Sequence, residues 1–325
     1  MSTRRRALAA GLALGPLALR PLPARDQTQL RPVRRLGVLG NVPSLPAPVL
    51  EQLLLARGWR VGGNLLLEER WARGDMARLG ELARQLLNAR VDVISAEGDL
   101  AAQAAAAATR SVPIVMHGLA PVELGLAQSL ARPGGNVTGV VYQANDYMGK
   151  QLDLLRAIRP GLQRLGIVDN ANPFGRGWHA GWQEAVQGWG ISLHKVPYPV
   201  TLAELDLTLA SAQRERVQSI EFSLNHALRG EGWRTIGGWA LQHKVVTSAP
   251  EYARGEAMLA FGANGAHFIQ LVLDQLDPML RGANPAELPI QQPTRFDIVI
   301  AKRQLRSIGL EVPLPVLLQA TEVIE

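Results

Sequence analysis

The sequence predicts an α/β protein of two doubly wound lobes, each built on a parallel β-sheet, with a hinge and a cleft between them. Three observations support this prediction. The chain has 325 residues, enough for about two domains of ordinary size. Short apolar runs alternate with amphipathic stretches, which is the pattern of βαβ units with parallel strands. This pattern occurs twice, beginning at Arg35 and at Arg164.

The first copy alternates strands and helices without interruption. Its opening run, RLGVLGN, is apolar and ends in glycine and asparagine, as a strand followed by a loop does. The later helices are amphipathic or, in the last case, rich in alanine. The expected elements are strand 35–41, helix 49–59, strand 64–70, helix 76–90, strand 91–95 and a helix and strand within 101–118.

The second copy starts with RLGIVDN and repeats the same order. Trp182 and Trp189 lie at helical spacing, so we expect both to be core residues. The expected elements are strand 164–170, helix 171–190, strand 191–197, helix 202–216, strand 217–222 and a helix and strand within 232–250.

A candidate hinge lies between the two copies, in SLARPGGNVTGVV. Pro133 ends the preceding helical stretch, and Gly134 and Gly135 can adopt positive φ angles. A strand over residues 137–142 then carries the chain across to the second lobe. We therefore expect hinge positions at Gly134, Gly135 and Tyr142; the alternative is an ordinary loop before a strand.

The N-terminus has the layout of an export signal. Three arginines, Arg4 to Arg6, precede an uncharged run over 7–19, which is too short to span a membrane, and cleavage is expected after Ala24. Removing the four arginines of residues 1–24 lowers the formal net charge from +6 to +2, too little to indicate nucleic-acid binding. With no cysteine, the chain has no disulfide and no lipid-anchored cysteine. We expect a periplasmic protein that is not lipid-anchored.

Four stretches of the sequence resemble the tryptophan and aromatic-type solute-binding proteins of ABC importers. They are RGWRVGGNLLLEERWARGD, SLARPGGNVTG, RGANPAELPIQQPTRFDIVI and the closing ATEVIE, and the resemblance runs from about Arg34 to Glu325. It implies a type I periplasmic-binding-protein fold in which three crossing segments join two lobes. It also implies a small organic solute held in the cleft, namely an amino acid, an aromatic compound or a related carboxylate. Hinge closure and an inner-membrane ABC permease as partner are implied as well.

The combined domain prediction has three parts: a signal peptide over 1–24, an N-terminal lobe over 33–141 plus about 262–290, and a C-terminal lobe over 142–261 plus about 291–325. We expect a monomer that requires no cofactor.

Ligands of open α/β sheets bind outside the carboxyl ends of the strands, so the loops that follow the expected strands are the candidate site. The side chains there include hydrogen-bonding groups and aromatic rings that can stack on a flat solute. The candidate ligand-binding residues are Ser44, Glu97, His117, Asn172, Phe174, Trp178, Asn225 and Tyr252.

Two departures from the resembled family affect the choice of solute. Ala120 stands in Ala-Pro-Val where many relatives have Asp-Pro-Val, and Asn225 stands where an acid is frequent. An amino acid's ammonium group needs a carboxylate partner, so either Glu97, Glu251 or Asp169 supplies it or the ligand is not an amino acid. The nearby Asp99 is expected to cap the helix that follows it.

The main alternative function is a secreted two-lobed enzyme, such as a glycosyltransferase or hydrolase, with Glu97 and Glu251 as an acid and base pair. No catalytic motif is present in the sequence, and its six histidines lack metal-ligand spacing, so we expect neither catalytic nor metal-binding residues. A sugar-repressor-like regulator is excluded, because no helix-turn-helix precedes Arg35.

Overall fold

A computed structural model describes residues 33–142, 144–169, 173–199, 201–222 and 230–325 of the chain. Within these ranges, the side chains of residues 144–147, 169, 173–178 and 252 are not described. The predicted signal segment, residues 1–24, lies outside the described residues. Among the helices in the described ranges, none combines the length and the apolar character needed to cross a bilayer.

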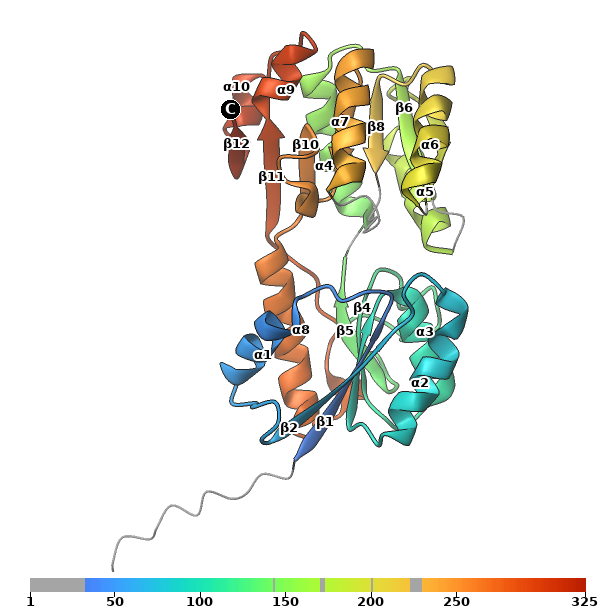
Figure 1. Cartoon of the computed structure of the whole chain (residues 1–325), viewed down its shortest axis with the longest axis vertical. Helices are drawn as coiled ribbons and strands as arrows, with labels where there is room; N and C mark the ends of the chain where they lie inside the picture. Colours follow the sequence, from blue (N-terminus) through green and yellow to red (C-terminus); the bar gives the residue numbers. More distant parts are fainter. Residues whose placement is uncertain (1–32, 143, 170–172, 200, 223–229) are drawn as a thin grey trace, which may run out of the picture. The chain divides into compact units, whose positions relative to one another are not determined.

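The first lobe is built on a five-stranded sheet in the order β2-β1-β3-β4-β5, and every strand pair in it is parallel. Figure 1 shows α1 and α8 on one face of this sheet and α2 and α3 on the other. The elements are β1 (Arg34–Gly40), α1 (Ala47–Leu55), β2 (Leu65–Trp71), α2 (Leu79–Asn88), β3 (Val93–Glu97), α3 (Asp99–Ala108), β4 (Ile114–Gly118) and β5 (Val137–Val141).

Covering both faces of this sheet requires strands that are apolar along their whole length. All five residues of β5 are buried, and so are the first four of β3. One face packs on the alanines of α3 and the leucines of α2, and the other packs on α1 and α8. The alanine-rich composition of α3 therefore lets that helix lie close to the sheet.

The second lobe has a seven-stranded sheet in the order β12-β11-β10-β9-β8-β6-β7. Its first part repeats the first lobe, because β7-β6-β8-β9 has the same order as β2-β1-β3-β4. The elements are α4 (Ala144–Ile158), β6 (Arg164–Asp169), α5 (Pro173–Ala185), β7 (Ser192–Pro197), α6 (Leu202–Arg214), β8 (Ser219–Phe222), α7 (Glu231–His243), β9 (Val246–Ala249), β10 (Leu259–Ala263), β11 (Phe296–Ala301), α9 (Lys302–Ser307), α10 (Leu314–Leu317) and β12 (Glu322–Ile324).

These two sheets confirm the predicted fold class, with one correction. Strand β11 is antiparallel to β10, whereas a wholly parallel sheet was expected. The reason lies in the connection: the Asn264 N–H donates to the Arg295 carbonyl at 2.8 Å, so the chain re-enters this sheet where β10 leaves it. A strand that enters the sheet at the carboxyl end of its neighbour is antiparallel to that neighbour.

Helix α8 (Gly265–Leu280) and the segment after it pack on the first sheet. Apolar side chains of α8 share a core with Leu36 and Val38 of β1. Further along, the Gln291 N–H donates to the Gly139 carbonyl of β5, and the Val141 N–H donates to the Gln291 carbonyl, both at 2.9 Å. The chain from Asn264 to Gln291 thus lies against the first sheet, and β10 up to Ala263 belongs to the second.

The predicted hinge residues lie at opposite ends of β5. Gly134 has a φ of 73°, and its N–H donates to the Ala286 carbonyl at the amino end of the strand. Gly135 is next to it and is not among the residues with positive φ. Tyr142 follows the carboxyl end, where the chain leaves the first sheet. A hinge role for these residues stays a prediction.

The expectation for the two tryptophans of the α5 region is correct for one of them. Trp182 is fully buried, whereas 49% of Trp189 is exposed. Helix α5 ends at Ala185, and Gly188 and Gly190 then adopt positive φ, so helical spacing no longer applies at Trp189. Its ring instead lies 3.3 Å from the guanidinium carbon of Arg156, in a cation–π contact.

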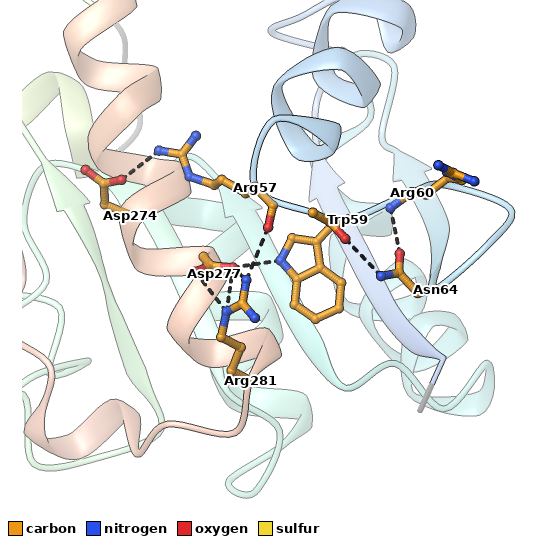
Figure 2. Close-up of polar contacts among 8 residues, drawn as sticks. Arg57, Trp59, Arg60, Asn64, Asp274, Asp277 and Arg281 are labelled. Atoms are coloured by element: carbon orange, nitrogen blue, oxygen red, sulfur yellow. Dashed lines mark hydrogen bonds and ion pairs between the residues drawn. The ribbon is translucent and has the colours of Figure 1, made fainter. Parts of the chain in front are cut away.

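A polar cluster fastens the segment between α1 and β2 to α8 (Figure 2). The indole N–H of Trp59 donates to Asp277 Oδ1 at 2.8 Å, and Arg281 Nε donates to both carboxylate oxygens of Asp277. A second pair joins Arg57 Nη2 to Asp274 Oδ1 at 2.6 Å. Trp59 is almost completely buried, so its N–H depends on Asp277 for a partner.

We expect Asp277→Ala to lower the free energy of unfolding by about 2 kcal/mol, because it leaves a buried indole N–H and the Arg281 guanidinium without their acceptor. Asp274→Ala is the matched control, since it removes a more exposed ion pair of the same helix and should cost under about 1 kcal/mol. Urea denaturation of both variants tests this, and equal losses would contradict it.

Candidate functional site

A cavity of about 400 Å³ opens at the carboxyl edge of the first sheet and extends between that sheet, α1 and α8. Its interior is apolar, and its polar side chains come from the ends of strands and from the loops that follow them. The apolar wall includes Leu36, Val38, Leu50, Val272, Leu273 and Leu276; the polar groups are Asn41, Ser44, Glu69, Ser95, Glu97, His117, Tyr142 and Glu251.

Glu97 is the last residue of β3 and lines this cavity. Its carboxylate accepts a hydrogen bond from Ser44 Oγ at 3.0 Å. Burial raises the pKa of Glu97 to about 7, and the negative charge of Glu69 acts in the same direction, while the Ser44 hydrogen bond acts against it. Glu97 therefore changes its charge near neutral pH, and a ligand of either charge would shift that equilibrium.

Gly40 explains why Glu97 has an aromatic neighbour. A Cβ on Gly40 would lie 2.8 Å from Cζ3 of Trp71 and 3.0 Å from Cβ of Glu97. Since Gly40 has no side chain, the Trp71 ring from β2 lies across the end of β1, close to Glu97. The carboxylate and the indole ring thus lie close together at the cavity.

His117 of β4 is a neutral group in the cavity wall. Its Nε2 lies 3.0 Å from Ser95 Oγ, and burial lowers the pKa of His117 to about 4. Phe268 contacts its ring edge-on, with the centroids 6.1 Å apart, and stacks on Tyr142 at 4.4 Å. A neutral imidazole of such low basicity is suited to hydrogen bonding and packing, rather than to abstracting a proton near neutral pH.

The second lobe contributes Glu251 to the same cavity. Burial raises the pKa of Glu251 to about 7; the charge of Asp297 adds to this rise, and the charge of Arg254 opposes it. A Cβ on Gly262 would lie 2.2 Å from Glu251 Oε2, so a glycine is needed where this carboxylate crosses β10. Burial, and then the Glu251 charge, raises the pKa of the Tyr142 phenol, which remains a hydrogen-bond donor.

Asp99 has a different role from the predicted helix cap. Gly98 is the N-cap residue of α3, with a φ of 98°, and Asp99 is the first residue of the helix. The Asp99 carboxylate accepts from the Leu119 N–H at 2.9 Å and so fixes the loop after β4. Gly118 permits this approach, because a Cβ there would lie 2.2 Å from Asp99 Oδ1.

The structure brings four of the predicted residues together in one cavity: Ser44, Glu97, His117 and the hinge residue Tyr142. Glu251, one of three possible carboxylate partners for an ammonium group, joins them. Asn172 and Asn225 lie outside the described residues, as do the side chains of Phe174, Trp178, Tyr252 and Asp169. A role for those residues in binding stays a prediction.

Sequence reasoning missed Trp71, Glu69 and the α8 wall around Phe268. Trp71 ends β2, and the rule that ligands meet the carboxyl ends of strands would have found it had the loop after β2 been included. No comparable rule points to α8, because only the packing of that helix on β1 brings Phe268 to the cavity.

Across the described residues, no three histidine, aspartate or glutamate side chains gather as a metal site would require. The arrangement is a largely apolar chamber with a few hydrogen-bonding and ionisable groups at one end. Such a chamber can enclose and orient a small molecule. Two lobes of repeated βα topology together with this chamber define a solute-binding protein.

The chain belongs to the family of ABC transporter substrate-binding proteins, whose model matches residues 50–324. This confirms the resemblance seen in the sequence. The chain is also 34% identical over 119 residues to a tyrosine-binding protein of Clostridioides difficile (strain R20291). That match covers 36% of this chain, and the chain spans only a third of that relative's length, 33%.

Solved structures share the fold over nearly the whole chain. A conserved domain protein from Vibrio cholerae has a TM-score of 0.77 and 23% identity, with coverage of 90% of this chain and 99% of that one. A Streptococcus pneumonia ABC domain in complex with L-Trp has a TM-score of 0.76 and 20% identity, with the same coverage. At these identities the likeness establishes the fold alone.

Proposed function

We propose that this chain is the extracytoplasmic solute-binding component of an ABC importer. It closes on a small organic solute between its two lobes and delivers the solute to a permease of the inner membrane. Family membership supports the transport role. The observation that carries the proposal is the cavity, which at about 400 Å³ has the size and the apolar, sparsely polar lining of a small-molecule site.

We further propose that the protein acts in the periplasm after its N-terminal signal is removed. The arginine-led apolar segment at residues 4–19 supports export. The lobes then correspond to residues 33–141 with 264–291, and 142–263 with 292–325. Closure would bend the chain near Tyr142, near Asn264 and at residues 292–295, where the chain passes between the two sheets.

The expected solute has an aromatic or other apolar body. The sequence pointed to an amino acid, an aromatic compound or a related carboxylate, and the tyrosine-binding relative is in keeping with that range. In this chain, Trp71, Tyr142 and Phe268 line the cavity, and Tyr142 and Phe268 stack on each other. Aromatic rings pack on one another in offset-stacked or edge-on geometry, which fits a planar solute.

The experiment is a binding screen on the purified protein after unfolding and refolding to remove any copurified solute. Thermal shift identifies binders among amino acids, aromatic acids, amines, purines and sugars, since a ligand at a hundred times its Kd adds about 2.7 kcal/mol of stability. Titration calorimetry then gives the Kd. We expect Trp71→Ala to weaken binding of the identified solute about tenfold, through the loss of ring contact.

Trp189→Ala is the matched control, because its ring is half exposed and is not part of the cavity lining. It should leave the Kd unchanged. If both variants weaken binding equally, or if neither does, the cavity is not the site. Mass spectrometry of the solute after incubation tests the enzyme alternative, since conversion to a product would contradict a pure binding role.

A further inference from the structure

The cavity wall carries an unbalanced negative charge. Three carboxylates line it, from Glu69, Glu97 and Glu251, and its described lining contains no lysine or arginine. His117 adds no positive charge near neutral pH, since burial holds its pKa near 4. A ligand that brings a positive charge would balance this lining, and a ligand anion would be repelled by it.

Glu97 and Glu251 lack an ion-pair partner among the described side chains. Glu97 accepts hydrogen bonds from the neutral hydroxyl and the backbone N–H of Ser44. The arginine nearest Glu251 is Arg254, which forms its ion pairs with Asp297 at 3.5 Å and Glu322 at 2.7 Å. Both partly buried carboxylates are therefore available to a ligand ammonium group, which would form charge-assisted hydrogen bonds with them.

Two helix N-termini at the cavity, those of α3 and α8, are already compensated, whereas α1 begins without a side-chain cap. Gly98 precedes α3, and the Asp99 carboxylate lies in the first turn of that helix. At the start of α8, the Asn264 side chain accepts from the His267 N–H. These ends hold less attraction for a ligand carboxylate than bare helix ends would.

The rest of the cavity is lined by apolar side chains. Its wall follows α8 from Gly265 to Leu276, which at 1.5 Å per residue is roughly 16 Å of helix. Phe268 is at the polar end with Trp71 and Tyr142, where ring faces attract a cation. Val272, Leu273 and Leu276 are almost completely buried and close the inner end of the cavity with apolar side chains.

We propose that the solute is an organic amine without a carboxylate, whose ammonium group lies at the end of the cavity that carries Glu97 and Glu251 and whose apolar body packs beside α8. This inference rests on the proposed binding function. It narrows the solute from amino acids and aromatic acids to primary amines with an aromatic or alkyl body.

Matched pairs of compounds test it, because each pair differs only in the carboxylate. Calorimetry of the refolded protein would compare tryptamine with tryptophan, tyramine with tyrosine, and phenethylamine with phenylalanine, with octylamine as an alkyl probe. We expect the best-binding amine to have a Kd at least tenfold below that of its amino acid, or octylamine to bind more tightly than all three amino acids.

Three results would overturn the inference. If an amino acid binds as tightly as its amine, the inference is wrong but the proposed binding function still holds. Binding confined to sugars, purines or acids would have the same meaning. If no compound of the wider screen binds, both this inference and the proposed function are wrong.

The pH dependence of amine binding gives a second readout. The Kd should fall about tenfold between pH 6 and pH 8, because the ammonium group requires ionised carboxylates. Ser44 and Glu69 face Glu97, while Tyr142, Asp297 and Arg254 act on Glu251, and His117 stays neutral over this range. A Kd that rises with pH would indicate an anionic ligand group and would overturn the proposal.

Substitutions assign this pH dependence to residues. Glu97→Gln and Glu251→Gln should each weaken amine binding at pH 8 by about tenfold and flatten the pH profile. Glu51→Gln, an exposed position of α1 outside the cavity lining, is the control and should change neither. If both cavity variants keep the wild-type Kd at pH 8, the ammonium group does not lie where the proposal puts it.

Discussion

Glu221→Gln should stabilise the protein, and the gain should grow as the pH rises from about 5 to 8. Glu221 lies on β8 and is fully buried. Its Oε2 accepts from Gln151 Nε2 at 2.7 Å, and the same nitrogen donates to Ser248 Oγ. In the part of the chain that the structure describes, Oε1 of Glu221 and Oε1 of Gln151 have no hydrogen-bond partner.

The expected pH dependence follows from the raised pKa. Burial raises the pKa of Glu221 to about 8, although hydrogen bonds from Ser248 and Gln151 oppose the rise. Between a pKa of about 4.5 in the unfolded chain and about 8 in the folded protein, the folded state holds a proton that the unfolded state has released. Stability therefore falls as pH rises through this window and levels off above it.

The glutamine variant does not titrate, so its advantage over the wild type should increase across the window by an amount on the order of 3 to 5 kcal/mol. Urea denaturation at pH 5, 6, 7 and 8 measures this. Glu81→Gln changes an exposed position of α2. Its free energy of unfolding should instead show the same pH profile as that of the wild type. Parallel profiles for Glu221→Gln would mean that Glu221 titrates alike in both states.

Gly139→Ala should be the most damaging single methyl addition in the first lobe, with a loss of about 3 to 5 kcal/mol. Gly139 has a φ of 147°, and a Cβ there would lie 2.1 Å from the Met116 carbonyl oxygen and 2.6 Å from its nitrogen. Both are backbone atoms of β4, the strand paired with β5. Relief of the clash would require the two strands to separate.

Gly149→Ala on α4 is the contrasting control, because nothing lies within 4 Å of the added methyl group and alanine favours the helix. It should raise stability by about 0.5 to 1 kcal/mol. Thermal and urea unfolding of both variants tests the pair. A Gly139→Ala protein as stable as the wild type would show that β5 can shift without cost.

The repeated βα pattern was predictable from the sequence because short, mostly apolar runs alternate with amphipathic or alanine-rich helices in both halves. The RLGVLGN and RLGIVDN runs became β1 and β6, at matching positions of the two sheets. The direction of β11 was not predictable, since it depends on where the chain re-enters the sheet after its long contact with β5. Local residue patterns do not determine where the chain re-enters the sheet.

The candidate site was predictable where it follows strand ends, as for Ser44, Glu97 and His117. It was not predictable where it depends on packing between distant segments. Phe268 reaches the cavity only because α8 lies on β1, and Trp71 reaches Glu97 only because Gly40 between them has no side chain. The pKa of Glu97 likewise depends on burial, which the local sequence does not give.

Helix α8 presents an apolar face and a polar face. Its cavity face includes Val272 and Leu276, while Asp274, Asp277 and Arg281 lie on the side that binds Arg57 and Trp59. Val272 and Leu276 also belong to the core that α8 shares with β1, so the cavity face and the polar face hold the helix in place together. Under the proposed function, exchanging these apolar side chains would change the length of solute accepted, while the polar cluster around Asp277 would still fasten α8 to the segment before β2.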